Sequence, residues 1–248
     1  MKKTIPWTSL KAAAACAVAG ITLASVAEGG ERRFVYSYET STYVPGSIEL
    51  ENWVTWKTDD GFDRFDFRHE IEIGITEKFQ LGLYLVDWRL QDGEESFHDT
   101  AVEGIYNVLN PYEDPFGLSL YGEVKFADEF LELEGKILLQ KHFGPLSVVY
   151  NFILETEWEE AGLSEVKGEI GNTFGVSYML NQKFGIGGEF LHEVEIADWE
   201  DAGKSAFYVG PNASFRSGPA WVTAAGLWEV SETEEPEFQL RLLTGWHF

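Results

Sequence analysis

The stretch FDFRHEIEIGI, residues 65–75, alternates apolar and charged side chains along its length. The odd-numbered positions carry Phe and Ile side chains together with His69. The even-numbered positions carry Asp66, Arg68, Glu70 and Glu72. Successive side chains of a β-strand point to opposite sides, so this stretch predicts a strand with one apolar face and one charged face.

The same period of two recurs along most of the chain. Alternation is clear in nine further segments: 48–57, 79–85, 116–125, 131–139, 146–154, 170–178, 184–190, 207–215 and 238–248. It is weaker near residues 99–109 and 220–229, where the spacing still predicts strands. These segments predict about 12 strands. Residues 34–43 are also strand-like; we expect them to lead into the first strand, with a thirteenth wall strand as the alternative.

The connections between these segments differ in length in a regular order. Short turns lie at residues 76–78, 144–145, 181–183 and 216–219, and longer acidic segments lie at 91–98, 158–165, 194–204 and 229–236. Short turns on one rim and longer loops on the other are typical of outer-membrane barrels. We therefore predict an all-β fold, a single antiparallel up-and-down transmembrane β-barrel, with the short turns facing the periplasm.

Residues 1–27 have the layout of a cleaved signal peptide. Lys2 and Lys3 precede an apolar run that ends in small residues at Ser25 and Ala27. We expect residues 1–27 to be removed and residues 28–248 to form the barrel. A retained anchor is the alternative, although the run is short for a bilayer-spanning helix. Cys16 is the only cysteine, so the remaining chain can form neither a disulfide nor a thiolate metal site.

The charge of the chain excludes nucleic-acid binding, which needs a basic surface. Asp and Glu number 42 against 18 Lys and Arg, for a net charge of −24. Lys2, Lys3 and Lys11 lie in the predicted signal peptide, so the exported chain is more acidic still.

Alternation alone does not tell which face of the strands points inward. In a soluble secreted barrel or sandwich the apolar face would point inward and the charged face to solvent. The Phe-, Leu- and Ile-rich faces suit lipid, and the charged faces hold more charge than a packed core accepts, because each buried unpaired charge costs several kcal/mol. We therefore expect a wet lumen. The candidate lumen and selectivity residues are Glu49, Glu51, Asp66, Arg68, Glu70, Glu72, Glu132, Glu134 and Arg241.

The tryptophans fall near the ends of the predicted strands, as at Trp56, Trp88, Trp228 and Trp246. Amphipathic rings settle at the level of the lipid headgroups, so these positions suit the aromatic girdles of a membrane barrel. Ordinary packing aromatics are the alternative for each of them.

The last segment, FQLRLLTGWHF at residues 238–248, ends the chain on an aromatic residue. It closely resembles the closing strand of bacterial outer-membrane barrels, whose terminal aromatic is recognised by the barrel-assembly machinery. The resemblance implies that Trp246 and Phe248 form an assembly signal and that this machinery is a partner. The alternative is an ordinary amphipathic strand that ends in Phe.

Three motifs connect the chain with a known group of proteins: TYVPGSIELENW at residues 42–53, VGP at 209–211 and GWHF at 245–248. With them the chain resembles a family of small uncharacterised bacterial outer-membrane β-barrels, loosely similar to barrels assigned to phenol- and hydrocarbon-pathway transport. The resemblance implies a barrel and a transport function. It supplies no catalytic residues.

The sequence offers no clear catalytic motif. It contains no GxSxG, HExxH or phosphate-binding loop. His98 precedes Asp99, but adjacent strand residues point to opposite faces, so we do not expect them to act together. We expect no enzymatic activity, no cofactor and no metal site in the barrel.

Acidic loops supply the remaining candidate sites. Pairs such as Asp59-Asp60, Glu94-Glu95 and Glu200-Asp201 could bind divalent cations through carboxylate oxygens, although none fits a calcium-loop motif. The simpler interpretation is a solvated surface beside outer-membrane lipid and lipopolysaccharide.

The acidic lumen favours a small cation-preferring, porin-like channel, by the logic of carboxylate rings in cation pores. The number of strands does not decide whether the lumen is open, since about 8 strands give a filled interior and 16 or more give an open channel. The alternative is a closed structural or surface-binding barrel with acidic extracellular loops.

Overall fold

The computed structural model describes residues 32–248, so the predicted signal peptide lies outside the described residues. The strands are β1 (Ile48–Asp59), β2 (Phe62–Thr76), β3 (Phe79–Gln91), β4 (Glu94–Leu109), β5 (Gly117–Ala127), β6 (Phe130–Phe143), β7 (Leu146–Glu159), β8 (Glu165–Met179), β9 (Phe184–Ala197), β10 (Asp201–Ala202), β11 (Ala206–Ser217), β12 (Ala220–Glu229) and β13 (Phe238–His247). Within this range, no helix is long and apolar enough to cross a membrane.

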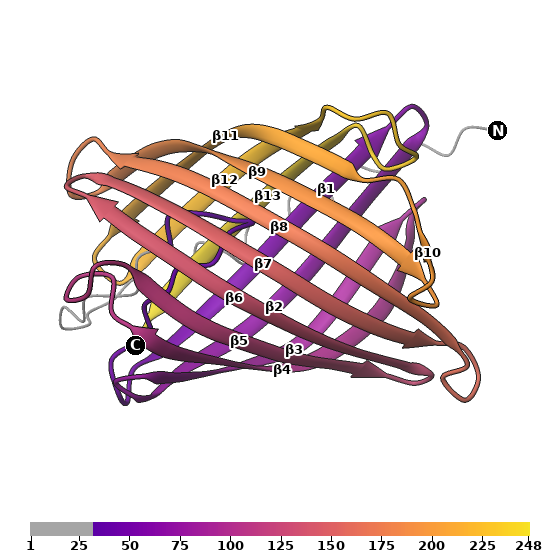
Figure 1. The fold of residues 1–248 in the computed structure, drawn as a ribbon, viewed down its shortest axis with the longest axis horizontal. Coiled ribbons are helices and arrows are strands. Elements are labelled where there is room, and N and C mark those ends of the chain that lie inside the picture. The colour runs from indigo at the N-terminus through magenta and orange to yellow at the C-terminus, as the bar shows by residue number, and fades with distance from the viewer. Residues whose placement is uncertain (1–31) are drawn as a thin grey trace.

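Twelve of these strands close into one antiparallel barrel (Figure 1). Each strand pairs with the next, β9 pairs with β11, and β13 closes the ring on β1 from Glu49↔His247 to Thr58↔Phe238. The two-residue β10 pairs only with the end of β9. The prediction of an up-and-down barrel of about 12 strands is confirmed.

The barrel is apolar outside and charged inside. Along β1, Glu49 and Glu51 are fully buried, whereas Ile48 is 43% exposed. Leu120 on β5 and Ile137 on β6 are likewise exposed at mid-strand. Buried carboxylates and exposed aliphatic side chains on one strand fit a wall between lipid and a polar lumen, and not the core of a soluble sandwich.

We expect Ile137→Arg to destabilise the folded barrel in lipid by about 2–4 kcal/mol, the cost of an arginine on the lipid face near mid-strand. Urea unfolding in vesicles would measure it, with Ile137→Leu as the control for altered packing. Equal stabilities of the two variants would contradict an outward, lipid-facing position of residue 137.

Aromatic rings form a band on the outer surface near one rim. Phe67 stacks on Trp88 at a centroid distance of 4.0 Å, Trp56 stacks on Phe65 at 6.1 Å, and Trp228 lies 4.8 Å from Phe238. These tryptophans occupy the end of the strands opposite to Trp246. The arrangement suits the aromatic girdle that the sequence predicted.

The strands run further than their apolar alternation suggested, so one loop prediction was wrong. Residues 91–98 are not a long loop, because β3 ends at Gln91 and β4 begins at Glu94. Asp92 and Gly93 have φ of 54° and 83°, as a two-residue type I′ hairpin requires. Strand residues beyond the bilayer do not face lipid, so their side chains need not alternate with apolar ones. Their backbones nevertheless continue to pair. Longer connections remain at 160–164, 198–205 and 230–237.

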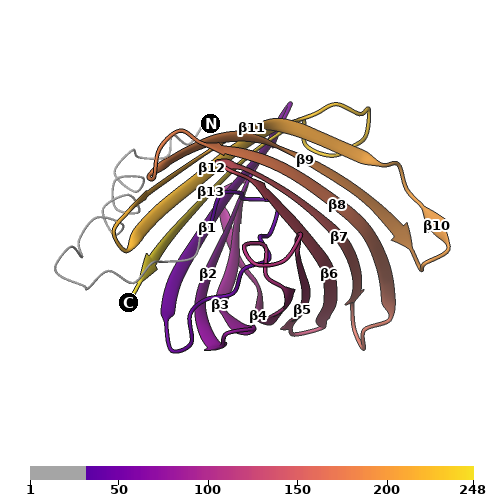
Figure 2. The ribbon, with the colours of Figure 1, turned by 60° about the vertical axis from the view of Figure 1, so that its left-hand side comes forward.

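Residues 32–46, here called the lumen segment, do not form a wall strand. Figure 2 shows this indigo stretch inside the barrel, before it joins β1 at the rim that carries Phe248. The expectation that residues 34–43 lead into the first strand is confirmed, and they do so from within the lumen.

Candidate functional site: a lumen closed by residues 32–46

The lumen segment fills the barrel with buried side chains. Phe34 is fully buried, and Val35, Tyr36 and Tyr38 are each at most 6% exposed. Val35, Tyr36 and Tyr38 join wall residues such as Trp53, Tyr121 and Leu138 in one buried cluster. The described part of the chain therefore supplies its own occupant for the lumen.

A tight turn brings the chain from the lumen into the wall. Gly46 has φ of 84°, and its N–H donates to the carbonyl of Gly74 at 2.8 Å, while Gly74 donates to Ser47 at 3.0 Å. A Cβ at position 74 would collide with the carbonyl oxygen of Val44. Glycine at position 74 thus lets two backbones approach closely at this rim.

A carboxylate holds the middle of the lumen segment. Three successive N–H groups, those of Val35, Tyr36 and Ser37, donate to the Glu189 carboxylate on β9 at 2.9, 2.8 and 3.0 Å. Asn212 donates to the same carboxylate at 3.0 Å. Buried N–H groups need acceptors, and bonds to a charged acceptor are stronger than neutral ones.

Side-chain amides of the wall take the place of a neighbouring strand further along the segment. Asn151 accepts from the Tyr38 N–H at 2.6 Å and donates to its carbonyl at 3.1 Å. Gln140 accepts from the Thr40 N–H at 2.9 Å. Gln80 accepts from the Tyr43 N–H at 3.1 Å.

Cations pack on aromatic rings at the centre of the lumen. The Tyr38 ring lies 4.4 Å from the Arg32 guanidinium and 4.2 Å from the Lys136 ammonium, and its centroid is 5.0 Å from that of Tyr121. Arg241 lies over the Tyr36 ring at 4.2 Å and donates to the Val35 carbonyl at 3.4 Å. Cation–π contacts of this kind are stabilising where water is excluded.

The inner wall leaves room for the lumen segment at particular positions. A Cβ at Gly175 of β8 would lie 2.6 Å from ring carbons of Phe34, and one at Gly117 would collide with the Thr40 hydroxyl. Wall and segment therefore fit each other sterically as well as through hydrogen bonds.

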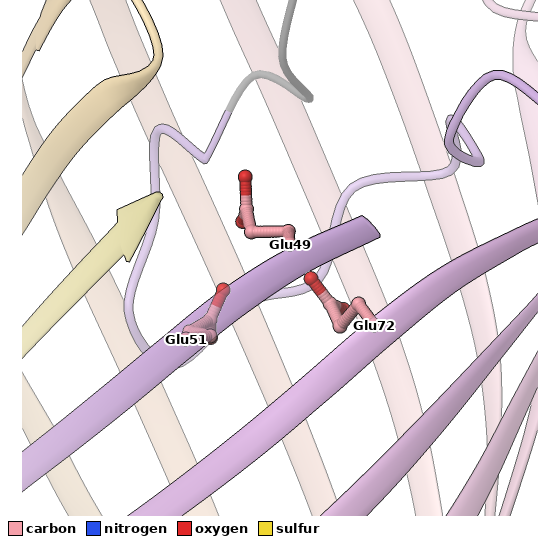
Figure 3. A group of neighbouring side chains, drawn as sticks. All are labelled: Glu49, Glu51 and Glu72. Carbon is pink, nitrogen blue, oxygen red and sulfur yellow. The ribbon is translucent and has the colours of Figure 1, made fainter. Parts of the chain in front are cut away.

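All nine candidate lumen residues lie on the inner face of the barrel. Glu49, Glu51, Glu70, Glu72 and Glu132 are at most 4% exposed. Figure 3 shows Glu49 and Glu51 on β1 beside Glu72 on β2. Glu49 accepts from Tyr43 at 2.7 Å and from Trp221 at 2.9 Å, and Glu51 pairs with Arg32 at 3.2 Å.

Four further candidates, Asp66, Arg68, Glu132 and Glu134, belong to ion-pair networks towards the opposite rim. Arg68 pairs with Asp87 at 3.0 Å and with Glu123 at 2.7 Å, and Asp66 accepts from Arg89 at 2.8 Å. Lys125 pairs with Glu132, while Lys136 pairs with Glu134 at 2.7 Å. The Arg241 Nε donates to Thr55 at 2.9 Å.

One expectation about neighbouring side chains was wrong. His98 Nδ1 and Asp99 Oδ2 lie 2.7 Å apart, although we expected adjacent strand residues to diverge. The register of β3 and β4 shifts on both sides of Asp87↔Asp99, and such irregularities redirect side chains. Asp99 is buried and His98 is half-buried, beside the ring of Phe130.

A cavity of about 770 Å³ lies at the rim that carries Phe248. Its lining includes Arg32, Glu39, Thr42, Lys183 and His247. The lumen segment thus separates this vestibule from the ion-pair networks on its far side.

The sequence reasoning missed the wall residues that bind the lumen segment. It singled out charged groups and passed over the amides of Gln80, Gln140 and Asn151, which lie at the inward positions of their strands. Amides at inward positions, together with an aromatic stretch left over after twelve strands, were the available signal.

The family model described as "Family of unknown function (DUF6662)" matches residues 26–239. The chain belongs to this family. A search of curated proteins finds no match.

Solved structures with a similar fold are outer-membrane channels and porins. The COG4313 outer membrane channel from Pseudomonas putida F1 is 10% identical, with a TM-score of 0.61 over 87% of this chain and 100% of the other. The NanC porin is 10% identical, with a TM-score of 0.57 over 80% and 97%. The KdgM porin, solved with disordered oligogalacturonate, is 9% identical, with a TM-score of 0.52 over 82% and 99%. At these identities the likeness establishes the barrel fold.

Proposed function

We propose that this family member is an outer-membrane channel for small polar solutes, closed by its own lumen segment. The observation that carries the proposal is the way the segment is held, by polar side chains of the wall rather than by main-chain pairing within the sheet. Water can replace such bonds, so each contributes only about 0.5–1.5 kcal/mol net, or more at the Glu189 carboxylate.

Release of the segment would leave a wall that water can solvate. Asn151, Gln140 and Gln80 would then face an aqueous lumen with the carboxylates of Glu51 and Glu72. A barrel built only for rigidity would gain more from an apolar core, since buried polar groups are costly unless satisfied. The related porin fold supports transport as the purpose of the polar lumen.

We further propose that the open channel prefers cations. Glu49, Glu51, Glu70 and Glu72 gather at the level of Arg32, and carboxylate rings attract cations in other pores. Single-channel conductance of the folded protein under a KCl gradient in a planar bilayer tests both statements. We expect discrete steps with a cation-side reversal potential, more frequent in Glu189→Ala than in the wild type.

Glu193→Ala is the matched control, because Glu193 lies four residues further along the inner face of β9. A disulfide between Thr40→Cys and Gly117→Cys, side chains within disulfide reach, should silence the channel until it is reduced.

A closed structural or surface-binding barrel is the second candidate, favoured by the complete burial of Phe34 and Thr40. If Glu189→Ala and a variant lacking residues 32–44 both insert but never conduct, the channel proposal fails and this candidate stands.

A further inference from the structure

Three buried carboxylates face one another inside the barrel. Oxygens of Glu70 and Glu72 on β2 and of Glu103 on β4 all lie within 4.8 Å of one another, and the residues are at most 2% exposed. Glu72 also belongs to the neighbouring group with Glu49 and Glu51 (Figure 3). Like charges this close repel strongly when water is excluded.

Glu70 has no hydrogen-bond partner on either carboxylate oxygen among residues 32–248. Its carboxylate occupies the space above Gly82 on β3, where a Cβ would collide with Oε1 and lie 3.2 Å from the Glu103 Cβ. The missing side chain at position 82 thus lets the two flanking strands bring their carboxylates together. Most buried polar groups in native proteins are satisfied, so a fully buried carboxylate without partners indicates a missing ligand.

The other two carboxylates are each oriented by one donor. Gln80 donates to Glu72 Oε1 at 2.7 Å, and Tyr84 donates to Glu103 Oε2 at 2.9 Å. Their second oxygens, like both oxygens of Glu70, have no hydrogen-bond partner in the described chain. Outer partners that fix a carboxylate and leave its other oxygen free are typical of metal ligands.

We propose that Glu70, Glu72 and Glu103 bind one calcium ion on the inner face of the barrel wall. The site offers four oxygens without hydrogen bonds, all hard donors of the kind that calcium selects, and water completes its six to eight ligands. Magnesium fits less well because it demands a regular octahedron and keeps most of its water. Arg32 already pairs with Glu51, so it leaves negative charge on the three carboxylates uncompensated. The calcium ion would offset that charge.

The site shares Glu70 and Glu72 with the proposed cation preference, but its test does not depend on channel activity, because calcium binding requires only the folded barrel. Since the carboxylates are buried, the ion is expected to enter during folding and to exchange slowly. Residues 28–248 are therefore folded into detergent micelles with CaCl₂, desalted into calcium-free buffer and analysed for metal by mass spectrometry. Folding is checked separately by heat-dependent migration in gels.

We expect close to one calcium per chain in the wild type and at least a tenfold loss in Glu70→Gln. Glu193→Gln, an inward-facing acid on β9 outside the cluster, should retain the ion. Gly82→Ala keeps every acid but displaces the Glu70 carboxylate, so it should also lose calcium; it decides the matter if Glu70→Gln fails to fold. A calcium-free wild type, or equal calcium in wild type and both cluster variants, would overturn the proposal.

Discussion

Replacing Glu189 by alanine is expected to increase the exposure of the lumen segment to solvent by at least about a hundredfold. The change removes the charged acceptor of three consecutive N–H groups, at a cost on the order of 3–5 kcal/mol in a buried setting. Each 1.4 kcal/mol corresponds to a tenfold change in population, so a segment that opens locally is released long before the barrel unfolds.

Maleimide labelling of Ser37→Cys measures this exposure. Ser37 is 2% exposed and its hydroxyl has no hydrogen-bond partner in the described chain, so cysteine is a mild replacement. The only natural cysteine, Cys16, lies outside residues 28–248, so the label reports a single position. The comparison is with Glu193→Ala in the same background. Equal labelling rates in the two variants would show that Glu189 does not hold the segment.

Deleting Phe248 is expected to abolish most assembly in cells while leaving the folded barrel almost as stable. Phe248 is 67% exposed, and its N–H donates to the Ile48 carbonyl at 2.9 Å. Loss of an exposed terminal ring should cost little in the folded state. If the aromatic end is read by the assembly machinery, its effect appears before the barrel has closed.

Two measurements separate these effects. The amount of heat-modifiable barrel in outer-membrane fractions reports assembly, and refolding yield in detergent reports stability. Phe143→Ala is the control, since Phe143 is 59% exposed at the same rim. Equal membrane levels for Phe143→Ala and the deletion would refute the assembly signal.

The seam between β1 and β13 links closure of the barrel to docking of the lumen segment. Trp246 pairs with Leu50 on one side and with Ala220 on the other, and His247 contacts Glu49 at 2.7 Å. The last strand therefore completes the wall and also positions Glu49, which in turn accepts from Tyr43 of the lumen segment. Closure of the barrel and docking of the segment meet at one carboxylate.

The sequence by itself determined the strands, their orientation and the inward set of acids. Alternation is a local property, because a side chain's face depends only on its parity along the strand. Alternation sorts the side chains into two faces, and the amount of charge on one of them assigned Glu49, Glu70 and Glu72 to a wet lumen. Leu120 and Ile137, on the apolar face, were thereby assigned to lipid. The loop at 91–98 was misassigned because pairing continues where the apolar signal stops.

Only the tertiary structure decided what fills the lumen. Whether residues 34–43 join the wall or enter the barrel depends on the closure of β13 on β1, which leaves no free edge to pair with. Which N–H meets Glu189 or Asn151 depends on residues more than a hundred positions away in the chain. Which carboxylate is left beside Gly82 depends on the register of β2 on β3. Such contacts arise from closure, so no local pattern encodes them.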